Sequence, residues 1–101
     1  MPTTVIDSTG QLLKAESGAA YFVGTIPVPA GARFSWTNGY VEEVKMPWAR
    51  YFVAVENGQK SISNTLKLDA HGDVTNLADF GAISDEDFQR RRDFLTLIPT
   101  K

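Results

Sequence analysis

The sequence predicts a mainly β fold: a small antiparallel sheet, or a barrel or sandwich of hairpins, with one C-terminal α-helix. Asn-Gly occurs at 38–39 and again at 57–58, each time between segments in which apolar and polar residues alternate. Asn-Gly favours a two-residue hairpin loop, because both central positions of a type I′ turn need a positive φ. Two such hairpins indicate an antiparallel meander rather than a parallel α/β sheet, and a helical pattern follows over about 84–97.

The size of the chain limits it to one small domain. Its 101 residues are enough for a single core and too few for two, so we expect one domain over 1–101, with hairpins over 3–80. Hydrophobic residues make up 43% of the chain and charged residues 22%, which is ordinary globular composition. We therefore expect a folded protein.

The first quarter of the chain predicts one hairpin and one strand. Over 3–14, the β-branched segment TTVID, the turn residues STG and the segment QLLKA form a hairpin pattern. The run AAYFVGTIPV is apolar and of strand length. Pro27 and Pro29 cannot donate to a ladder, so this strand ends there or lies at a sheet edge.

The first Asn-Gly hairpin carries an irregularity. With a two-residue loop, Trp36 faces Val41 and Phe34 faces Glu43, which puts a carboxylate on the apolar face. A bulge near Glu42 and Glu43 would restore the alternation. Alternatively, the hairpin stops there.

The second Asn-Gly hairpin follows the same design. Val55 faces Lys60 and Val53 faces Ile62, so the apolar residues of the two arms share one face. The second arm is expected to extend as far as Leu68. The segment VTNLADF, after the next turn, fits a short edge strand.

The helical pattern has a clear beginning. Ser84 is a good N-cap, and Asp87 three residues later forms a variant of the capping box. Phe88, Leu95 and Ile98 fall on one stripe, which we expect to pack on the sheet or on a neighbouring chain. Two i,i+4 ion pairs are expected, Glu86–Arg90 and Asp87–Arg91.

The residue composition and motifs argue against several kinds of functional site. The chain has no cysteine, which excludes disulfides and thiolate metal sites, and it has one histidine and no Gly-rich phosphate loop. Glu42 and Glu43 are adjacent, so in a regular strand they point to opposite faces. We therefore predict no enzyme activity and no catalytic, cofactor-binding or metal-binding residue.

The histidine lies in a turn pattern. His71 stands between Asp69 and Asp73 in LDAHGDV, and these three side chains could converge on a metal ion. The spacing does not match a calcium loop, which needs glycine at its sixth position and a distant glutamate. An exposed turn histidine is the interpretation that we prefer.

The charge pattern disfavours nucleic acid and membranes as partners. The net charge is −2, and the run Arg90–Arg92 lies among acidic residues, as on a solvated helix face. Stacking of bases on Trp36, Tyr40 and Trp48 is the remaining route to nucleic acid. No apolar run approaches the roughly 20 residues of a membrane span. With no signal-peptide pattern at its start, the chain is expected to be soluble.

Apolar residues exceed what one small sheet can cover. The run 21–26 is apolar on both faces, which favours a closed barrel or self-association into a dimer or trimer. Phe34 and Trp36 are assigned to the core, whereas Tyr40 lies on the opposite face of the hairpin. The candidate interaction surface comprises Tyr21, Val23, Tyr40, Trp48, Phe88 and Leu95.

Two segments share a strand, an Asp-x-x-Gly turn and a second strand, namely VIDSTGQLLKA and LKLDAHGDVTNL. This resembles elements of bacteriophage tail fibre, tailspike and other β-rich virion proteins. The resemblance covers about a fifth of the chain, and the chain lacks a fibre repeat and ends in a helix that is not typical of a fibre. It implies an assembly or attachment role in a virion, with other virion proteins as partners and without enzyme activity.

Two functional hypotheses remain open. The first is a self-associating structural or interaction module, located in a virion if the resemblance holds and otherwise in the cytoplasm. The second is a small domain that binds a host protein or a carbohydrate through exposed Tyr40 and Trp48. Size in solution separates them, because a trimer or ring supports the first and a monomer the second.

Overall fold

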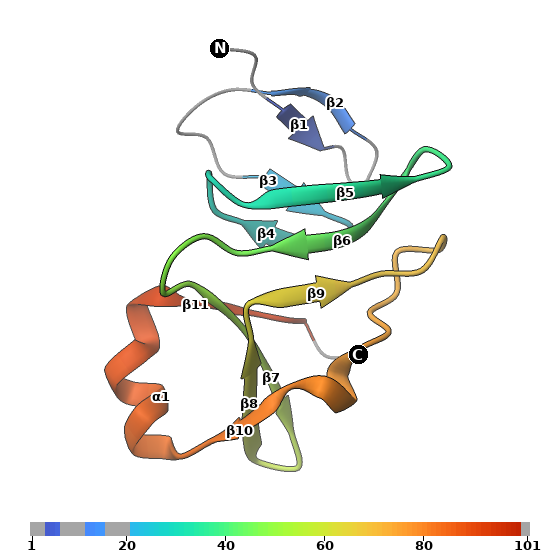
Figure 1. Ribbon diagram of the computed structural model, residues 1–101. Coiled ribbons are helices and arrows are strands. Elements are labelled where there is room, and N and C mark those ends of the chain that lie inside the picture. Colours follow the sequence, from blue (N-terminus) through green and yellow to red (C-terminus); the bar gives the residue numbers. More distant parts are fainter. Residues whose placement is uncertain (1–3, 7–11, 16–20, 100–101) are drawn as a thin grey trace.

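Short strands dominate the fold. The computed structural model describes residues 4–6, 12–15 and 21–99, and Figure 1 shows their arrangement. One α-helix, α1 (Asp85–Arg91), and two 3₁₀ helices, Leu77–Asp79 and Arg92–Phe94, accompany the strands in these ranges. The strands are β1 (Thr4–Ile6), β2 (Leu12–Ala15), β3 (Tyr21–Val23), β4 (Ile26–Val28), β5 (Arg33–Thr37), β6 (Tyr40–Lys45), β7 (Tyr51–Glu56), β8 (Gln59–Ser63), β9 (Thr65–Lys67), β10 (Gly81–Ile83) and β11 (Leu95–Leu97).

The strands form four small sheets, and none of the described strands closes a barrel. The sheets are β1-β2, β3-β4, β5-β6-β9 and β10-β8-β7-β11. The first three lie in one half of the molecule, and the four-stranded sheet with α1 lies in the other half (Figure 1). Every pair is antiparallel except β7–β11, which is parallel. The predicted mainly β class with a C-terminal helix is therefore confirmed.

The first Asn-Gly hairpin has the predicted turn and the predicted bulge. Asn38 and Gly39 have φ of 51° and 84°, and Trp36 pairs with Val41. The register then shifts, so that Ser35 pairs with Glu43 and Glu42 is the extra residue. The bulge brings Val44 opposite Phe34, and the carboxylate of Glu43 leaves the apolar face.

The second Asn-Gly hairpin also has the predicted turn and register. Asn57 and Gly58 have φ of 51° and 79°, and Val53 pairs with Ile62. The expected alternation is incomplete, because Phe52 and Ala54 are buried as well as Val53. Strand β7 is thus covered on both faces.

The expected single strand over 19–28 is wrong, because residues 21–28 fold into a tight hairpin of their own. Strands β3 and β4 pair antiparallel, with Val23 opposite Ile26 across a two-residue loop. Gly24 has a φ of 61° at the first loop position, where a type II′ turn requires glycine. The hairpin predicted over 3–14 is present as β1 paired with β2, and its turn residues lie outside the described part of the chain.

The expected helix over 84–97 is correct only in its first half. Ser84 Oγ accepts a hydrogen bond from Asp87 N at 3.2 Å, as predicted for the N-cap. The α-helix ends at Arg91, and β11 begins at Leu95 and pairs with β7. The parallel ladder satisfies the backbone of this β-prone segment and lets Ile98 N donate to Val53 O at 3.0 Å. Phe88, Leu95 and Ile98 therefore do not form one helical stripe.

The chain changes sheets at Asn64, so the second arm of the Asn57-Gly58 hairpin does not run on to Leu68. Thr65 N donates to Ser63 Oγ at 3.1 Å, which fixes the corner. Strand β9 then pairs with β6 in the other sheet. The buried amide of Asn76 closes the opposite edge of β9, donating to Thr65 O and accepting from Lys67 N, each at 3.0 Å.

The core lies between the β3-β4, β5-β6-β9 and β7-β8 strands. Residues from all three groups form one buried cluster, in which Phe52, Leu66 and Val44 are fully inaccessible. Phe34 and Trp36 pack against it partly buried, as expected for core aromatics. The remaining members are Val23, Ile26, Val28, Val41, Met46, Ala54, Leu68, Phe80 and Ile98.

Candidate interaction surface

A tight turn between β6 and β7 holds the most exposed large hydrophobic side chain of the described residues. Arg50 N donates to Pro47 O at 3.0 Å, so Trp48 and Ala49 are the two central turn residues. Ala49 has a φ of 52°, a left-handed conformation that costs a residue with a Cβ about 1–2 kcal/mol. Trp48 is 94% exposed. The fold therefore holds an indole in solvent on a strained turn.

A second aromatic residue lies next to this turn. The guanidinium carbon of Arg50 lies 5.5 Å from the centre of the Phe94 ring, within the range of cation–π attraction. Phe94 belongs to the 3₁₀ helix after α1 and is 46% exposed. The arginine thus joins the β6–β7 turn to the chain before β11. We call Trp48, Arg50 and Phe94 the aromatic surface.

Basic side chains flank the aromatic surface. Arg33 and Lys45 are cross-strand partners at the end of β6 that leads into the turn, and both are exposed. Arg92 and Asp93 precede Phe94 and are also exposed. With Arg50 included, four cations and one carboxylate are near Trp48 or Phe94 along the chain or across the β5–β6 pair, so this end of the molecule is basic although the whole chain carries −2.

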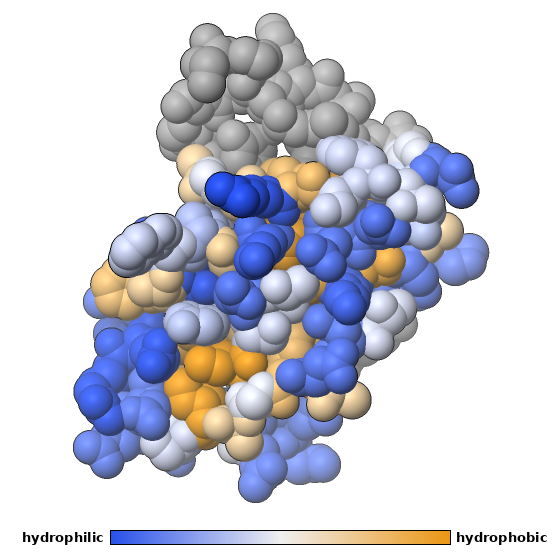
Figure 2. Space-filling model, in the orientation of Figure 1, coloured by the Kyte–Doolittle hydropathy of each residue, from blue (hydrophilic) through white to orange (hydrophobic). Residues whose placement is uncertain are grey.

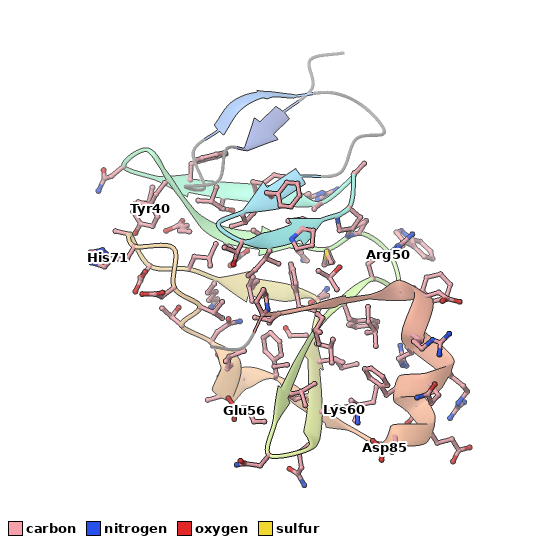
Figure 3. All side chains as sticks on the ribbon, turned by 180° about the vertical axis from the view of Figure 1, so that it is seen from behind. Tyr40, Arg50, Glu56, Lys60, His71 and Asp85 are labelled. Carbon is pink, nitrogen blue, oxygen red and sulfur yellow. The ribbon has the colours of Figure 1, made fainter. Side chains whose placement is uncertain are left out.

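A hollow of about 440 Å³ lies at the other end of β7. Strand β7 begins beside Arg50 and ends at Glu56, and these two residues are well separated in Figure 3. The wall is mostly apolar, with Glu56 and Asp73 as its charged members. The other lining residues are Thr25, Ile26, Ala54, Val55, Gly72, Val74, Leu77, Ile98 and Pro99. We call this concavity the hollow.

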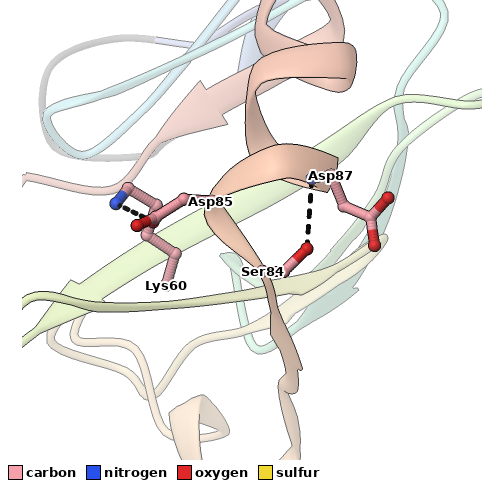
Figure 4. A network of polar contacts seen from close by, with 4 residues as sticks. All are labelled: Lys60, Ser84, Asp85 and Asp87. Atoms are coloured by element: carbon pink, nitrogen blue, oxygen red, sulfur yellow. Dashed lines mark hydrogen bonds and ion pairs between the residues drawn. The ribbon is translucent and has the colours of Figure 1, made fainter.

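The helix α1 is fixed on the outer face of the four-stranded sheet by charge and ring contacts. Lys60 Nζ lies 2.8 Å from Asp85 Oδ1 (Figure 4). The same Nζ lies 5.0 Å from the centre of the Phe88 ring. The guanidinium carbon of Arg91 lies 5.2 Å from the centre of the Tyr51 ring. The helix therefore covers this face through its first and last turns.

The ion pairs on α1 differ from those expected. Asp87 pairs with Arg90 at i,i+3, whereas Arg91 turns toward the sheet. The helix is short and leaves part of the sheet face open, and Figure 2 shows hydrophobic side chains gathered between α1 and the strands. Leu97 is the partner of Val53 on this face and is 59% exposed.

The Asp69–Asp73 turn has its own hydrogen bonds. Asp69 Oδ1 accepts from Asp73 N at 3.0 Å and from His71 N at 2.9 Å. The Asp73 N–H above all lowers the pKa of Asp69, with the His71 N–H and the His71 charge adding to the effect. The carboxylate therefore favours the turn above its unfolded pKa, and this contribution is lost as the pH falls through the folded pKa. Within 4–6, 12–15 and 21–99, no three His, Cys, Asp or Glu side chains converge on a point where a metal could bind.

The predicted surface residues are dispersed. Val23 is 2% exposed and belongs to the core, because β3 and β4 form a hairpin that packs inward. Tyr40 is the first residue of β6 and Trp48 lies three residues after its last, so the two cannot form one surface; Tyr40 lies near His71, away from Arg50 (Figure 3). Phe88 and Leu95 are half-buried on the α1 face.

Only one predicted surface residue belongs to the aromatic surface. Trp48 is that residue, and the side chain of Tyr21 lies outside the described part of the structure. Sequence reasoning missed Arg50 and Phe94, because the helix expected over 84–97 hid their proximity. The segment Pro-Trp-Ala-Arg offered a usable signal, since proline before a tryptophan between two strands indicates an exposed turn.

Comparison with other proteins finds no relative of this chain. No protein-family model, curated protein or solved structure matches the chain. No helix among the described residues is long and apolar enough to cross a bilayer.

Proposed function

We propose that this protein is a non-enzymatic assembly module that associates with itself through the aromatic surface. The observation that supports this best is the exposure of Trp48, 94% open to solvent on a turn whose Ala49 is in the left-handed region. Backbone strain at an exposed position tends to accompany function, so the outlier at Ala49 motivates a functional hypothesis for this turn. A partner that covers the indole removes this exposed apolar side chain from water.

The energetics favour a binding anchor. Covering a tryptophan removes about 150–250 Å² of surface from water. At about 25 cal/mol per Å², this is worth about 4–6 kcal/mol. Association costs at least about 4 kcal/mol in lost motion, so Trp48 alone gives weak binding and neighbouring contacts must add to it. Arg50 and Phe94 are suited to this, because arginine and aromatic residues are enriched in binding hot spots.

The setting that we propose is a virion. The strand–Asp-x-x-Gly–strand segments resemble those of β-rich bacteriophage virion proteins, and this resemblance implies an assembly or attachment role. In that setting other virion proteins are further partners. A cytoplasmic location is the alternative.

The test is the mass in solution. Sedimentation equilibrium of the wild-type chain over a roughly hundredfold concentration range should give a mass that rises above 11.1 kDa. Trp48→Ala should keep the mass at the monomer value over most of that range. Phe22→Ala is the matched control, because Phe22 is also exposed, at 51%, but lies on β3 away from the turn.

A wild-type mass that stays at 11.1 kDa would contradict self-association. The same surface would then serve the second hypothesis, binding of a host protein or a carbohydrate, because an open indole can stack on a sugar ring or enter a protein pocket. An equal fall in mass for Phe22→Ala and Trp48→Ala would contradict the assignment of the aromatic surface.

A further inference from the structure

We infer that self-association is head-to-tail, with Trp48 of one copy entering the hollow of the next. This rests on the proposed function and specifies the partner surface. The two surfaces lie at opposite ends of β7, so one copy cannot bring its own Trp48 into its own hollow. A second copy is the occupant that both surfaces fit.

The hollow suits an indole in size and lining. Its volume of about 440 Å³ falls within the ~300–1,000 Å³ of pockets that bind small molecules. Ile26, Val74 and Leu77 contribute apolar walls that would pack on the ring faces. An aromatic anchor in a preformed apolar pocket is the arrangement found at the centre of strong interfaces.

The charges of the two surfaces are complementary. The rim of the hollow carries Glu56 and Asp73, and both residues are exposed. The aromatic surface carries Arg50, flanked by Arg33 and Lys45. Insertion of Trp48 brings the basic end of one copy against the acidic rim of another. Two basic ends placed together, as in a two-fold contact through Trp48, would repel.

The symmetry follows from the use of two different surfaces. A contact between unlike surfaces leaves one of each free on every dimer, so it adds further copies until it closes into a ring or grows as a chain. A two-fold dimer stops at two copies. Head-to-tail contact therefore favours a trimeric or larger ring over the dimer among the expected closed states.

The experiment is a mixing test with two blocked variants. Trp48→Ala removes the anchor and keeps the hollow. Thr25→Arg keeps the anchor and places a long cation at the rim, at an exposed turn position that tolerates substitution. Each variant alone should remain at 11.1 kDa, with association weakened by about 30-fold or more. An equimolar mixture should form a 1:1 dimer and nothing larger, because only one functional contact remains.

A charge control, a second hollow variant and spectroscopic measurements accompany the mixture. Gln89→Arg adds the same charge on α1, away from the hollow, and should associate as the wild type does. Glu56→Lys is a second hollow variant at an exposed strand end, for use if Thr25→Arg unfolds, and circular dichroism reports folding for all of them. In a Trp36→Phe background, where Trp48 is the remaining tryptophan, the fluorescence should shift to the blue when the protein is concentrated, and this shift should be absent in both hollow variants.

The outcomes separate this inference from the proposed function. If the wild type associates, Trp48→Ala does not, and both hollow variants associate normally, the aromatic surface is correct and the head-to-tail contact is wrong. A mixture that stays monomeric while each variant is folded overturns the inference as well. If the wild type is monomeric, the proposed function itself fails.

Discussion

The two Asn-Gly hairpins share their turn chemistry and differ in what covers them. In β5–β6, one face packs on the core, and Arg33, Ser35 and Lys45 on the other face meet water. In β7–β8, Phe52 and Ala54 pack on the core, and the opposite face lies under α1. The turn sets the register of a hairpin, whereas its burial is decided by which other elements reach it.

The composition of the arms agrees with this difference. RFSWT alternates between polar and apolar residues, as is typical of a strand that is half-buried. YFVAV is apolar at every position, as is typical of a strand covered on both faces. The same Asn-Gly turn therefore closes a surface hairpin in one case and the central hairpin of the fold in the other.

The sharpest test of this comparison is the same substitution in both hairpins. Phe52 is fully buried, so Phe52→Ala should lower the free energy of unfolding by about 3–5 kcal/mol. Phe34 is partly buried on β5, and Phe34→Ala should cost about half as much. Urea unfolding followed by circular dichroism measures both values. Equal losses would contradict the greater burial of β7.

The next largest effect concerns the strand that joins the two halves. Asn76→Ala removes both hydrogen bonds to the open edge of β9 and should cost about 2–3 kcal/mol. Asn76→Asp keeps an acceptor for Lys67 N but buries a carboxylate oxygen against Thr65 O, so at neutral pH it should cost at least as much as Asn76→Ala. Chemical denaturation of the two variants gives the comparison. A loss below about 0.5 kcal/mol for Asn76→Ala would show that water replaces the amide.

The sequence predicted local features well and long-range ones poorly. Both Asn-Gly turns, the bulge at Glu42 and the Ser84 cap depend on residues a few positions apart, and all are present. The parallel pairing of β11 with β7 depends on two segments more than forty positions apart. Phe88, Leu95 and Ile98 fit a helical stripe, and only the presence of the β7 edge makes the second half a strand.

The residues of the aromatic surface and of the hollow are also brought together by long-range contacts, which the sequence predicts poorly. Trp48 could be selected from the sequence because it lies in a turn segment, but Phe94 is brought near Arg50 of the same turn only by the chain reversal at α1. Val23 was placed on the surface because Gly24 was not recognised as a type II′ position. The hollow is lined by five separate segments, and no local pattern predicts such a site.

A smaller effect tests how firmly α1 covers the outer face of β7–β8. Phe88 is half-buried under Lys60, so Phe88→Ala should lower stability by about 1–2 kcal/mol, less than a core aromatic. Arg90 is exposed and pairs only with Asp87 within the helix, so Arg90→Ala should cost less than about 0.5 kcal/mol. Denaturant melts separate the two. Equal and small losses would mean that the helix adds little to the sheet.

The smallest expected effect has the opposite sign and concerns the turn between the two hairpins. Ala49 has a φ of 52°, and glycine adopts this conformation without a Cβ penalty, so Ala49→Gly should raise stability by about 0.5–1 kcal/mol. The control is Ala82→Gly on exposed β10, where glycine should lower stability by about the same amount. Thermal unfolding measures both signs. Because the turn keeps its shape, Ala49→Gly should leave Trp48 exposed and association unchanged; a loss of stability would mean that the turn is not strained.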